Sequence, residues 1–176
     1  MTALAPVIPA SRDAFIQAFA DLYEHSPWVA ADTWDHLNGQ GLDSLEAIHQ
    51  AMSATLLAAD PERQLALIQA HPDLAGKAAV AGELTAASTR EQAGAGIHLC
   101  TPAEFARFTE LNDAYKARFG FPFIMAVKGS DRHQILAAFE QRIHHTRDQE
   151  FRCALDEINH IALFRLQALL SPKARP

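Results

Sequence analysis

Cysteine is scarce in this sequence: only Cys100 and Cys153 occur among 176 residues, and they are far apart. This scarcity excludes a disulfide framework and a zinc site built on CxxC pairs. No apolar run is long enough to span a bilayer, and the N-terminus lacks the basic and apolar segments of a secretory signal. The C-terminus does not fit the Ser-Lys-Leu type of peroxisomal signal. We therefore expect a soluble, cytoplasmic protein with no membrane partner.

Basic residues are in deficit as well, with 15 Lys and Arg against 21 Asp and Glu and a formal net charge of -6 at pH 7. Nucleic-acid-binding proteins usually carry a clustered basic face, so we expect no nucleic-acid partner. The composition, 49% hydrophobic and 20% charged, is typical of a globular chain. The length predicts one domain over residues 1–176, with a core from about residue 10 to about residue 170.

Runs of β-branched residues with period two are almost absent, whereas alanine and leucine are abundant. This pattern predicts an all-α fold, a single-domain bundle of about eight to ten helices. Capping residues and prolines indicate where the helices begin. The expected helices run from Ser11 to about Glu24, from Trp28 to about Asn38, from Asp43 (in a capping box with Glu46) past Leu56, from Asp60 to about Ala70, from Thr101 to Arg118, from Ser130 or Asp131 to about His145, and from about Asp148 to Leu170. Short helical turns and loops, punctuated by Gly76, Gly82, Gly94 and Gly96, are expected over residues 71–100.

An irregular apolar segment is expected near residues 119–129, where Gly120, Pro122 and Gly129 interrupt the helical pattern. Most of its side chains are expected to fill the core. Its backbone polar groups, however, have no obvious helical partners. Irregular backbone inside a helical protein often lines a ligand cavity, because those groups need partners.

Arg165 stands out on the last expected helix, because it shares a helical face with Ile158, Ile161, Ala162 and Leu169. An unpaired buried charge is costly, so a guanidinium in an apolar stripe needs an explanation. It either reaches solvent or pairs with an internal carboxylate, or it binds an anionic substrate between helices. Spacing alone leaves these interpretations open.

Two polar stretches could also carry chemistry. The proline after His71 places this histidine at or near the N-cap of a short helix, where a neutral imidazole would suit acid–base work. The simpler interpretation is a histidine that only caps a turn. Ser88 and Glu91 have capping-box spacing, which favours an ordinary helix start. The alternative is a recognition loop in which Glu91 and Gln92 bind amide or ureido groups.

Two Glu-x-x-His motifs, at Glu46–His49 and Glu157–His160, raise the alternative of a ferritin-like di-metal protein. Such a site also needs inward-facing glutamates from two further helices. The candidates look like solvent-side or capping positions, so no metal site is expected; they are Glu24, Glu104, Glu110 and Glu140.

Taken together, the chain resembles the 2-oxo-4-hydroxy-4-carboxy-5-ureidoimidazoline (OHCU) decarboxylases of urate breakdown. The resemblance covers about residues 10–170 and rests on the order and spacing of several motifs. These are His71-Pro72-Asp73-Leu74-Ala75-Gly76, Ser88-x-x-Glu91-Gln92, Asn112-x-x-Tyr115, Phe119-Gly120-Phe121-Pro122-Phe123, Val127-Lys128-Gly129 and Arg165-Leu166. It implies an all-helical homodimer that acts on the small molecule OHCU, forms (S)-allantoin and needs no cofactor.

The resemblance also implies roles for individual residues. His71 would be the acid–base group, and Glu91 and Arg165 would complete the catalytic set. The implied substrate-binding residues are Pro72, Ser88, Thr89, Arg90, Gln92, Phe123, Ile124, Met125, Ala126 and Val127. A helical module that binds a ureide without turnover remains the alternative function from a different class.

Overall fold

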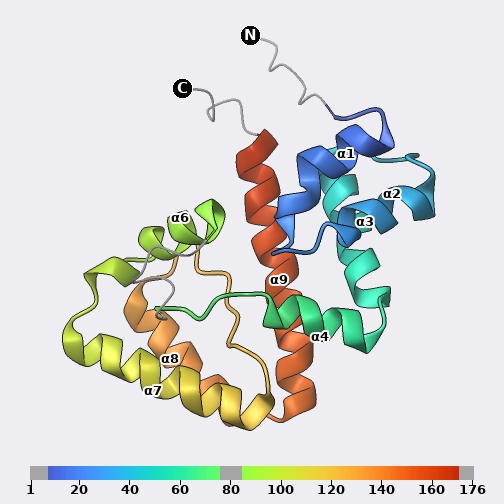
Figure 1. The fold of residues 1–176 in the computed structure, drawn as a ribbon. Helices are drawn as coiled ribbons and strands as arrows, with labels where there is room; N and C mark the ends of the chain where they lie inside the picture. The colour runs from blue at the N-terminus through green and yellow to red at the C-terminus, as the bar shows by residue number, and fades with distance from the viewer. Residues whose placement is uncertain (1–7, 76–84, 171–176) are drawn as a thin grey trace. The chain divides into compact units, whose positions relative to one another are not determined.

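The computed structural model describes residues 8–75 and 85–170. Within these ranges it has eight α-helices, two short 3-10 turns and no β-strand, which confirms the all-α prediction (Figure 1). The helices are α1 (Arg12–Phe19), α2 (Trp28–Leu37), α3 (Leu45–Ala58), α4 (Pro61–Gln69), α6 (Ala86–Gly94), α7 (Pro102–Phe119), α8 (Arg132–Arg142) and α9 (Arg147–Leu170), with 3-10 turns η1 (Ala20–Leu22) and η2 (Ile97–Leu99). No helix in these ranges is long and apolar enough to cross a membrane.

The chain forms two compact units, unit 1 with residues 1–67 and 159–176, and unit 2 with residues 68–158. Helix α9 supplies residues to both. Of the turns and loops expected over residues 71–100, positions 76–84, which include Gly76 and Gly82, lie outside the described residues. One domain over residues 1–176 stays a prediction.

Unit 1 is built on contacts of α1 with α2 and of α2 with α3, which lie side by side in Figure 1. Phe15 of α1 is fully buried and meets Phe19 edge-on, with ring centroids 4.9 Å apart. From α3, Ile48, Met52 and Leu56 are buried at helical spacing. The apolar stripes of these helices therefore face one common core.

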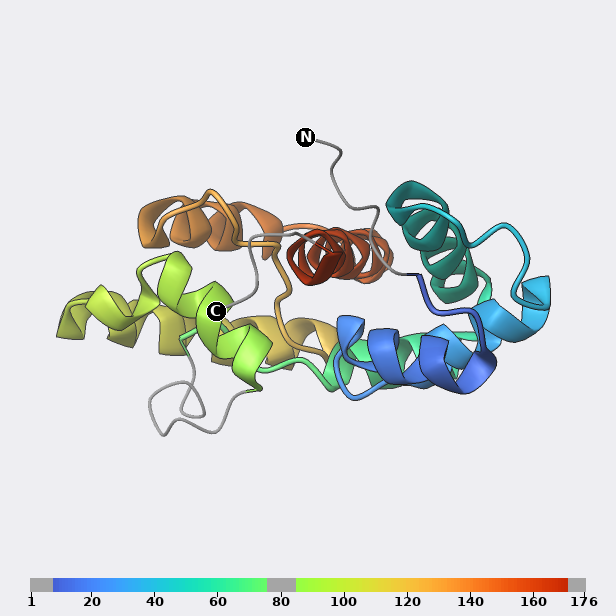
Figure 2. The same ribbon diagram turned by 90° about the horizontal axis from the view of Figure 1, so that it is seen from above.

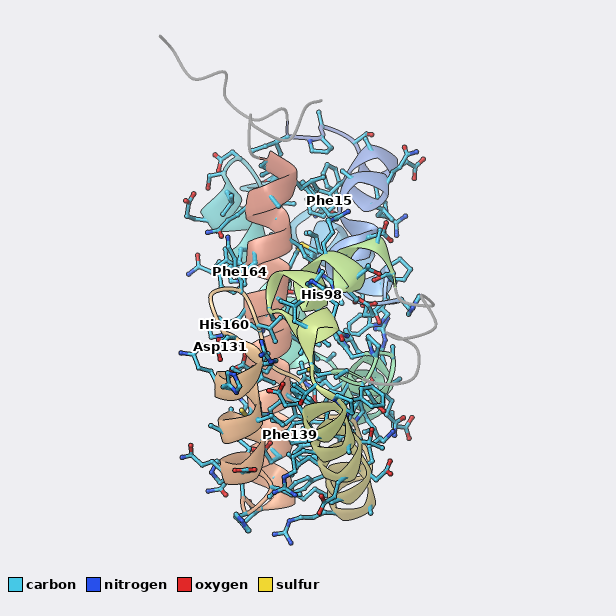
Figure 3. The ribbon with its side chains drawn as sticks, turned by 90° about the vertical axis from the view of Figure 1, so that its left-hand side faces the viewer. Phe15, His98, Asp131, Phe139, His160 and Phe164 are labelled. Carbon is cyan, nitrogen blue, oxygen red and sulfur yellow. The ribbon has the colours of Figure 1, made fainter. Side chains whose placement is uncertain are left out.

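Unit 2 contains an aromatic core between α7 and α8, which lie side by side in both ribbon views (Figures 1 and 2). Phe139 lies on the face of α8 that is turned toward α7 (Figure 3). Its ring stacks on Phe123 at 3.8 Å between centroids, and Tyr115 of α7 meets both rings edge-on. The apolar segment is thereby anchored in the core through Phe123.

The capping patterns predicted some helix starts correctly. Thr101 and Glu104 form the expected capping box at the start of α7, and Asp131 caps α8. The expected Asp43 cap is wrong: α3 is capped by Ser44, whose hydroxyl accepts a hydrogen bond from the N–H of Ala47. Two adjacent cap-forming residues compete there, and Ser44 has the extended backbone that a cap requires.

The expected end of the first helix is also wrong, since α1 stops at Phe19 rather than near Glu24. The chain tightens into η1 and then extends at Tyr23, so that Leu22, Tyr23 and Glu24 are all buried. Glu24, expected at a solvent-side or capping position, is only 3% exposed. Leu169, in contrast, is 51% exposed, so the apolar face of α9 ends before it.

Candidate active site

His71 lies just after α4 and is 9% exposed. Its backbone N–H donates to the carbonyl of Ile68, which closes the last turn after the helix. The short helix expected at or near His71 does not begin over residues 72–75, and the positions that follow, 76–84, lie outside the described residues. The chain turns at Leu74 and Ala75 instead, and Ala75 has a φ of 54°. The candidate site therefore has a buried imidazole shortly before this turn.

The turn after His71 is fixed by side chains from two helices. Gln92 of α6 accepts from the N–H of Ala75 at 3.0 Å and donates to the carbonyl of Asp73 at 3.3 Å. Asn112 of α7 donates to the carbonyl of Leu74 at 2.8 Å. Both amide side chains are buried, at 5% and 3% exposure. Backbone groups of three consecutive residues, Asp73 to Ala75, are therefore held in place shortly after His71.

The α6 candidates divide between two faces of the helix. Ser88 and Gln92, four residues apart, are buried, and Glu91 is half-buried. Thr89 and Arg90 are exposed, and the Thr89 hydroxyl donates to the Thr85 carbonyl within its own helix. The alternative in which Ser88 caps the helix is wrong, because Thr85 is the N-cap and accepts from the Ser88 N–H.

The segment over residues 121–128 is irregular, as expected, and two of its backbone groups form hydrogen bonds with charged side chains. Arg142 of α8 donates to the carbonyl of Ile124 at 2.7 Å, and the N–H of Ala126 donates to Glu157 of α9 at 2.8 Å. Phe123, Ile124 and Val127 are buried, whereas Met125 and Ala126 are half-buried; Met125 and Ala126 are thus the most accessible of the five candidate residues.

A buried carboxylate binds the arginine that holds this segment. Glu150 of α9 is 0% exposed and accepts from Arg142 Nε at 2.9 Å and from the Tyr115 hydroxyl at 2.6 Å. Its other oxygen lies 3.0 Å from Nδ1 of His145. Burial, and then the hydrogen bond to Glu150, raises the pKa of Tyr115 above its usual value, so Tyr115 stays a hydrogen-bond donor.

Arg165 belongs to unit 1, whereas the other site candidates belong to unit 2. Its side chain is 9% exposed and donates from Nη1 to Glu24, a carboxylate 2% exposed, at 2.8 Å. Among the interpretations left open by the sequence, pairing with an internal carboxylate is confirmed.

Members of the two Glu-x-x-His motifs bind other groups. Glu157 accepts from Ala126, and His49 Nε2 lies 2.9 Å from the carbonyl of Asn159. Within residues 8–75 and 85–170, no three His, Cys, Asp or Glu side chains are grouped in a way that could hold a metal ion.

Sequence reasoning missed several buried polar residues near the candidate site. Asn112, Arg142 and Glu150 were given no individual role, although each lies on a buried helix face. The signal that singled out Arg165 was present for Glu150, which is in helical register with Ala154 and Ile158. A polar residue inside an apolar stripe is the pattern that would have found it.

The Gln92→Ala variant should lose about 1–3 kcal/mol of unfolding free energy, because it leaves the Ala75 N–H and the Asp73 carbonyl without their buried partner. Urea denaturation followed by far-UV circular dichroism measures this loss. Arg90→Ala, on the exposed face of the same helix, is the matched control and should change stability by less than about 0.5 kcal/mol. Equal stability of the two variants would contradict the conclusion that Gln92 stabilises the turn at Asp73 to Ala75.

Comparisons with known proteins identify the family. The family model described as OHCU decarboxylase matches residues 9–167. A relative from Halalkalicoccus jeotgali, named 2-oxo-4-hydroxy-4-carboxy-5-ureidoimidazoline decarboxylase, is 44% identical over 164 residues, 93% of this chain and 89% of the relative. A Homo sapiens relative, named as a putative enzyme of the same kind, is 38% identical over 156 residues, 89% of this chain and 88% of its own.

Solved structures agree with this assignment. The crystal structure of (S)-allantoin synthase matches with a TM-score of 0.73 at 30% identity, over 92% of this chain and 51% of that one. The structure of OHCU decarboxylase in the presence of (S)-allantoin matches with a TM-score of 0.64 at 19% identity, over 80% of this chain and 91% of that one, a likeness of fold. By the match over nearly its whole length, the chain belongs to the OHCU decarboxylase family.

Proposed function

We propose that this chain is a carboxy-lyase that converts OHCU to (S)-allantoin in urate breakdown, without a cofactor. The observation that carries the proposal is the 44% identity, over about nine-tenths of both chains, to a relative named for this reaction. The buried His71 on its fixed turn supplies a group suited to moving a proton in such a site.

The chemistry is balanced without an added electron acceptor. The substrate's carboxylate sits on a carbon next to a ring C=N bond. When the C–COO⁻ bond breaks and CO2 leaves, the electron pair forms a C=C bond to the ureido-bearing carbon, and the ring nitrogen of the former C=N bond takes up a proton. The hydroxyl on the carbon that lost CO2 then gives up its proton as it becomes a carbonyl, and a proton adds to the neighbouring, ureido-bearing carbon. The protein must hold the breaking bond perpendicular to the ring and deliver the proton to one face. Positioned protein groups can supply both requirements.

We assign the proton transfer to His71, with Pro72 shaping the pocket next to it. Glu91 would fix the ureido arm, and Ser88 with Gln92 would bind the amide groups of the substrate. Burial of Ser88 and Gln92 and half-burial of Glu91, all on α6, support this assignment. Thr89 and Arg90 lie on the exposed face of α6, so a substrate-binding role for them has weaker support.

The remaining roles are assigned to elements outside α6. Residues 123–127 would close around the ring through Met125 and Ala126, their half-buried members. Arg165 would bind the substrate, because a guanidinium suits an anionic group. We further propose that the protein is a homodimer and acts in the cytoplasm. Both proposals rest on the family resemblance. Sedimentation at micromolar concentration tests the dimer: a single species of one-chain mass would overturn it.

An optical assay tests the reaction. Substrate is made fresh from urate with urate oxidase and hydroxyisourate hydrolase, because it decays spontaneously to racemic allantoin. Circular dichroism then follows the product with and without the protein. A fast, protein-dependent signal of one enantiomer supports the decarboxylase. Slow racemic decay in the presence of folded protein would overturn it and favour a module that binds a ureide without turnover.

A further inference from the structure

We propose that Arg142, oriented by Glu150, is a positioning residue that sets the backbone of residues 123–127 for catalysis. The catalytic part of this inference rests on the proposed function, in which that segment closes around the substrate ring. The pair lies outside the residues assigned to substrate contact.

Arg142 holds the segment with two different parts of its guanidinium. Nη1 donates to the carbonyl of Ile124 at 2.7 Å, and the guanidinium carbon lies 4.3 Å from the centroid of the Phe123 ring. The side chain is only 10% exposed, so the hydrogen bond is shielded from water. Two successive residues of the segment are therefore fixed by one side chain.

Glu150 fixes the guanidinium in turn. It accepts from Nε of Arg142 at 2.9 Å, so the arginine bridges a carboxylate and a backbone carbonyl through separate nitrogens. The Tyr115 hydroxyl donates to the same carboxylate oxygen. A carboxylate that is fully buried must be paired, and these donors leave it little freedom to move. Arg142 is thus held in one geometry rather than many.

The segment needs such support because it has no helix or strand of its own. Two side chains hold its backbone at alternate residues. Arg142 donates a hydrogen bond to the carbonyl of Ile124, and Glu157 accepts one from the N–H of Ala126. Met125 lies between the two anchored positions and is half-buried. A shift of about 1 Å in groups that position a substrate can cost on the order of a hundredfold in rate. These two hydrogen bonds therefore control how residues 125 and 126 contact the ring of the substrate.

The test compares Arg142→Met and Arg142→Lys with Arg107→Met. Arg107 of α7 is a matched control, since it also forms ion pairs within unit 2, and both of its partners, Glu110 and Glu140, lie outside the segment. A lysine has one nitrogen and cannot reproduce the bridge. The readouts are far-UV circular dichroism, amide hydrogen exchange of residues 124–127, and kcat and KM for OHCU.

We expect both Arg142 variants to keep their helical signal, to lose exchange protection over residues 124–127, and to fall about a hundredfold in kcat with a smaller change in KM. Arg107→Met should match the wild type in all three. A third variant, Arg142→Ala, leaves space for added methylguanidinium. This compound should restore part of kcat and part of the exchange protection over residues 124–127, which a merely structural role would not predict.

Failure of the positioning role and failure of the proposed function would give different results. Unchanged exchange over residues 124–127 in folded Arg142→Met would overturn the positioning role, even if the wild type proved inactive on OHCU. Lost protection with unchanged kcat and KM would also overturn it, because the segment's geometry would then not matter for the reaction. Failure of the wild type to turn over OHCU would refute the proposed function while leaving the exchange comparison to decide the structural step.

Discussion

The His71→Asn variant should keep its fold and lose turnover of OHCU by about a hundredfold to ten-thousandfold, the range that a positioned acid–base group contributes. Asparagine is polar and can form hydrogen bonds at this position, but it cannot take up and release a proton near neutral pH. His71 is 9% exposed beside a turn held by Gln92 and Asn112, so the polar replacement should be accommodated. Initial rates from the circular dichroism assay measure the loss.

His98→Asn is the matched control for this variant. His98 lies in η2, also within unit 2, and is exposed (Figure 3). Its replacement should leave both the melting temperature and the initial rate unchanged. Near wild-type turnover of His71→Asn would refute the acid–base role, whereas an unfolded His71→Asn would shift the comparison to His71→Gln under the same assay.

The sequence predicted the fold well where one residue type decides a local structure. Pro102 after Thr101, with Glu104 following, fixes the start of α7, because each contact of that capping box is local. The prediction failed where two local solutions compete, as at Asp43 and Ser44. It failed again at η1, where burial of Tyr23 and Glu24 by the rest of unit 1 overrides the helical pattern.

The site was harder to predict than the fold, and the reason lies in sequence separation. The hydrogen bond of Gln92 to Ala75 joins residues 17 apart, and that of Ala126 to Glu157 joins residues 31 apart. Motif order suggested that these stretches matter, but only packing decides which side chain meets which backbone group. The surroundings of His71 show the same limit: its place after the helix that starts near Asp60 was expected, but Gln92 and Asn112, which hold the turn after it, come from distant helices.

Removal of the Glu24 carboxylate should strongly destabilise the protein. Glu24→Ala leaves the guanidinium of Arg165 buried without this carboxylate, and breaking a buried pair costs about 3–5 kcal/mol. Urea denaturation of Glu24→Ala, Arg165→Met and the double variant Glu24→Met/Arg165→Met measures this cost. The double variant should recover most of the stability, because it removes both charges at once.

Kinetics of the same variants separate the two roles of Arg165. If Arg165 binds the substrate, the double variant should be nearly as stable as the wild type and yet lose turnover, because no guanidinium remains to bind the anionic substrate. Arg165→Lys should also lose turnover, since a lysine cannot reproduce the planar array of donors. A double variant with wild-type kcat and KM would show that Arg165 serves only to pair with Glu24. Stability and turnover therefore report on different partners of one side chain, and only the double variant separates them.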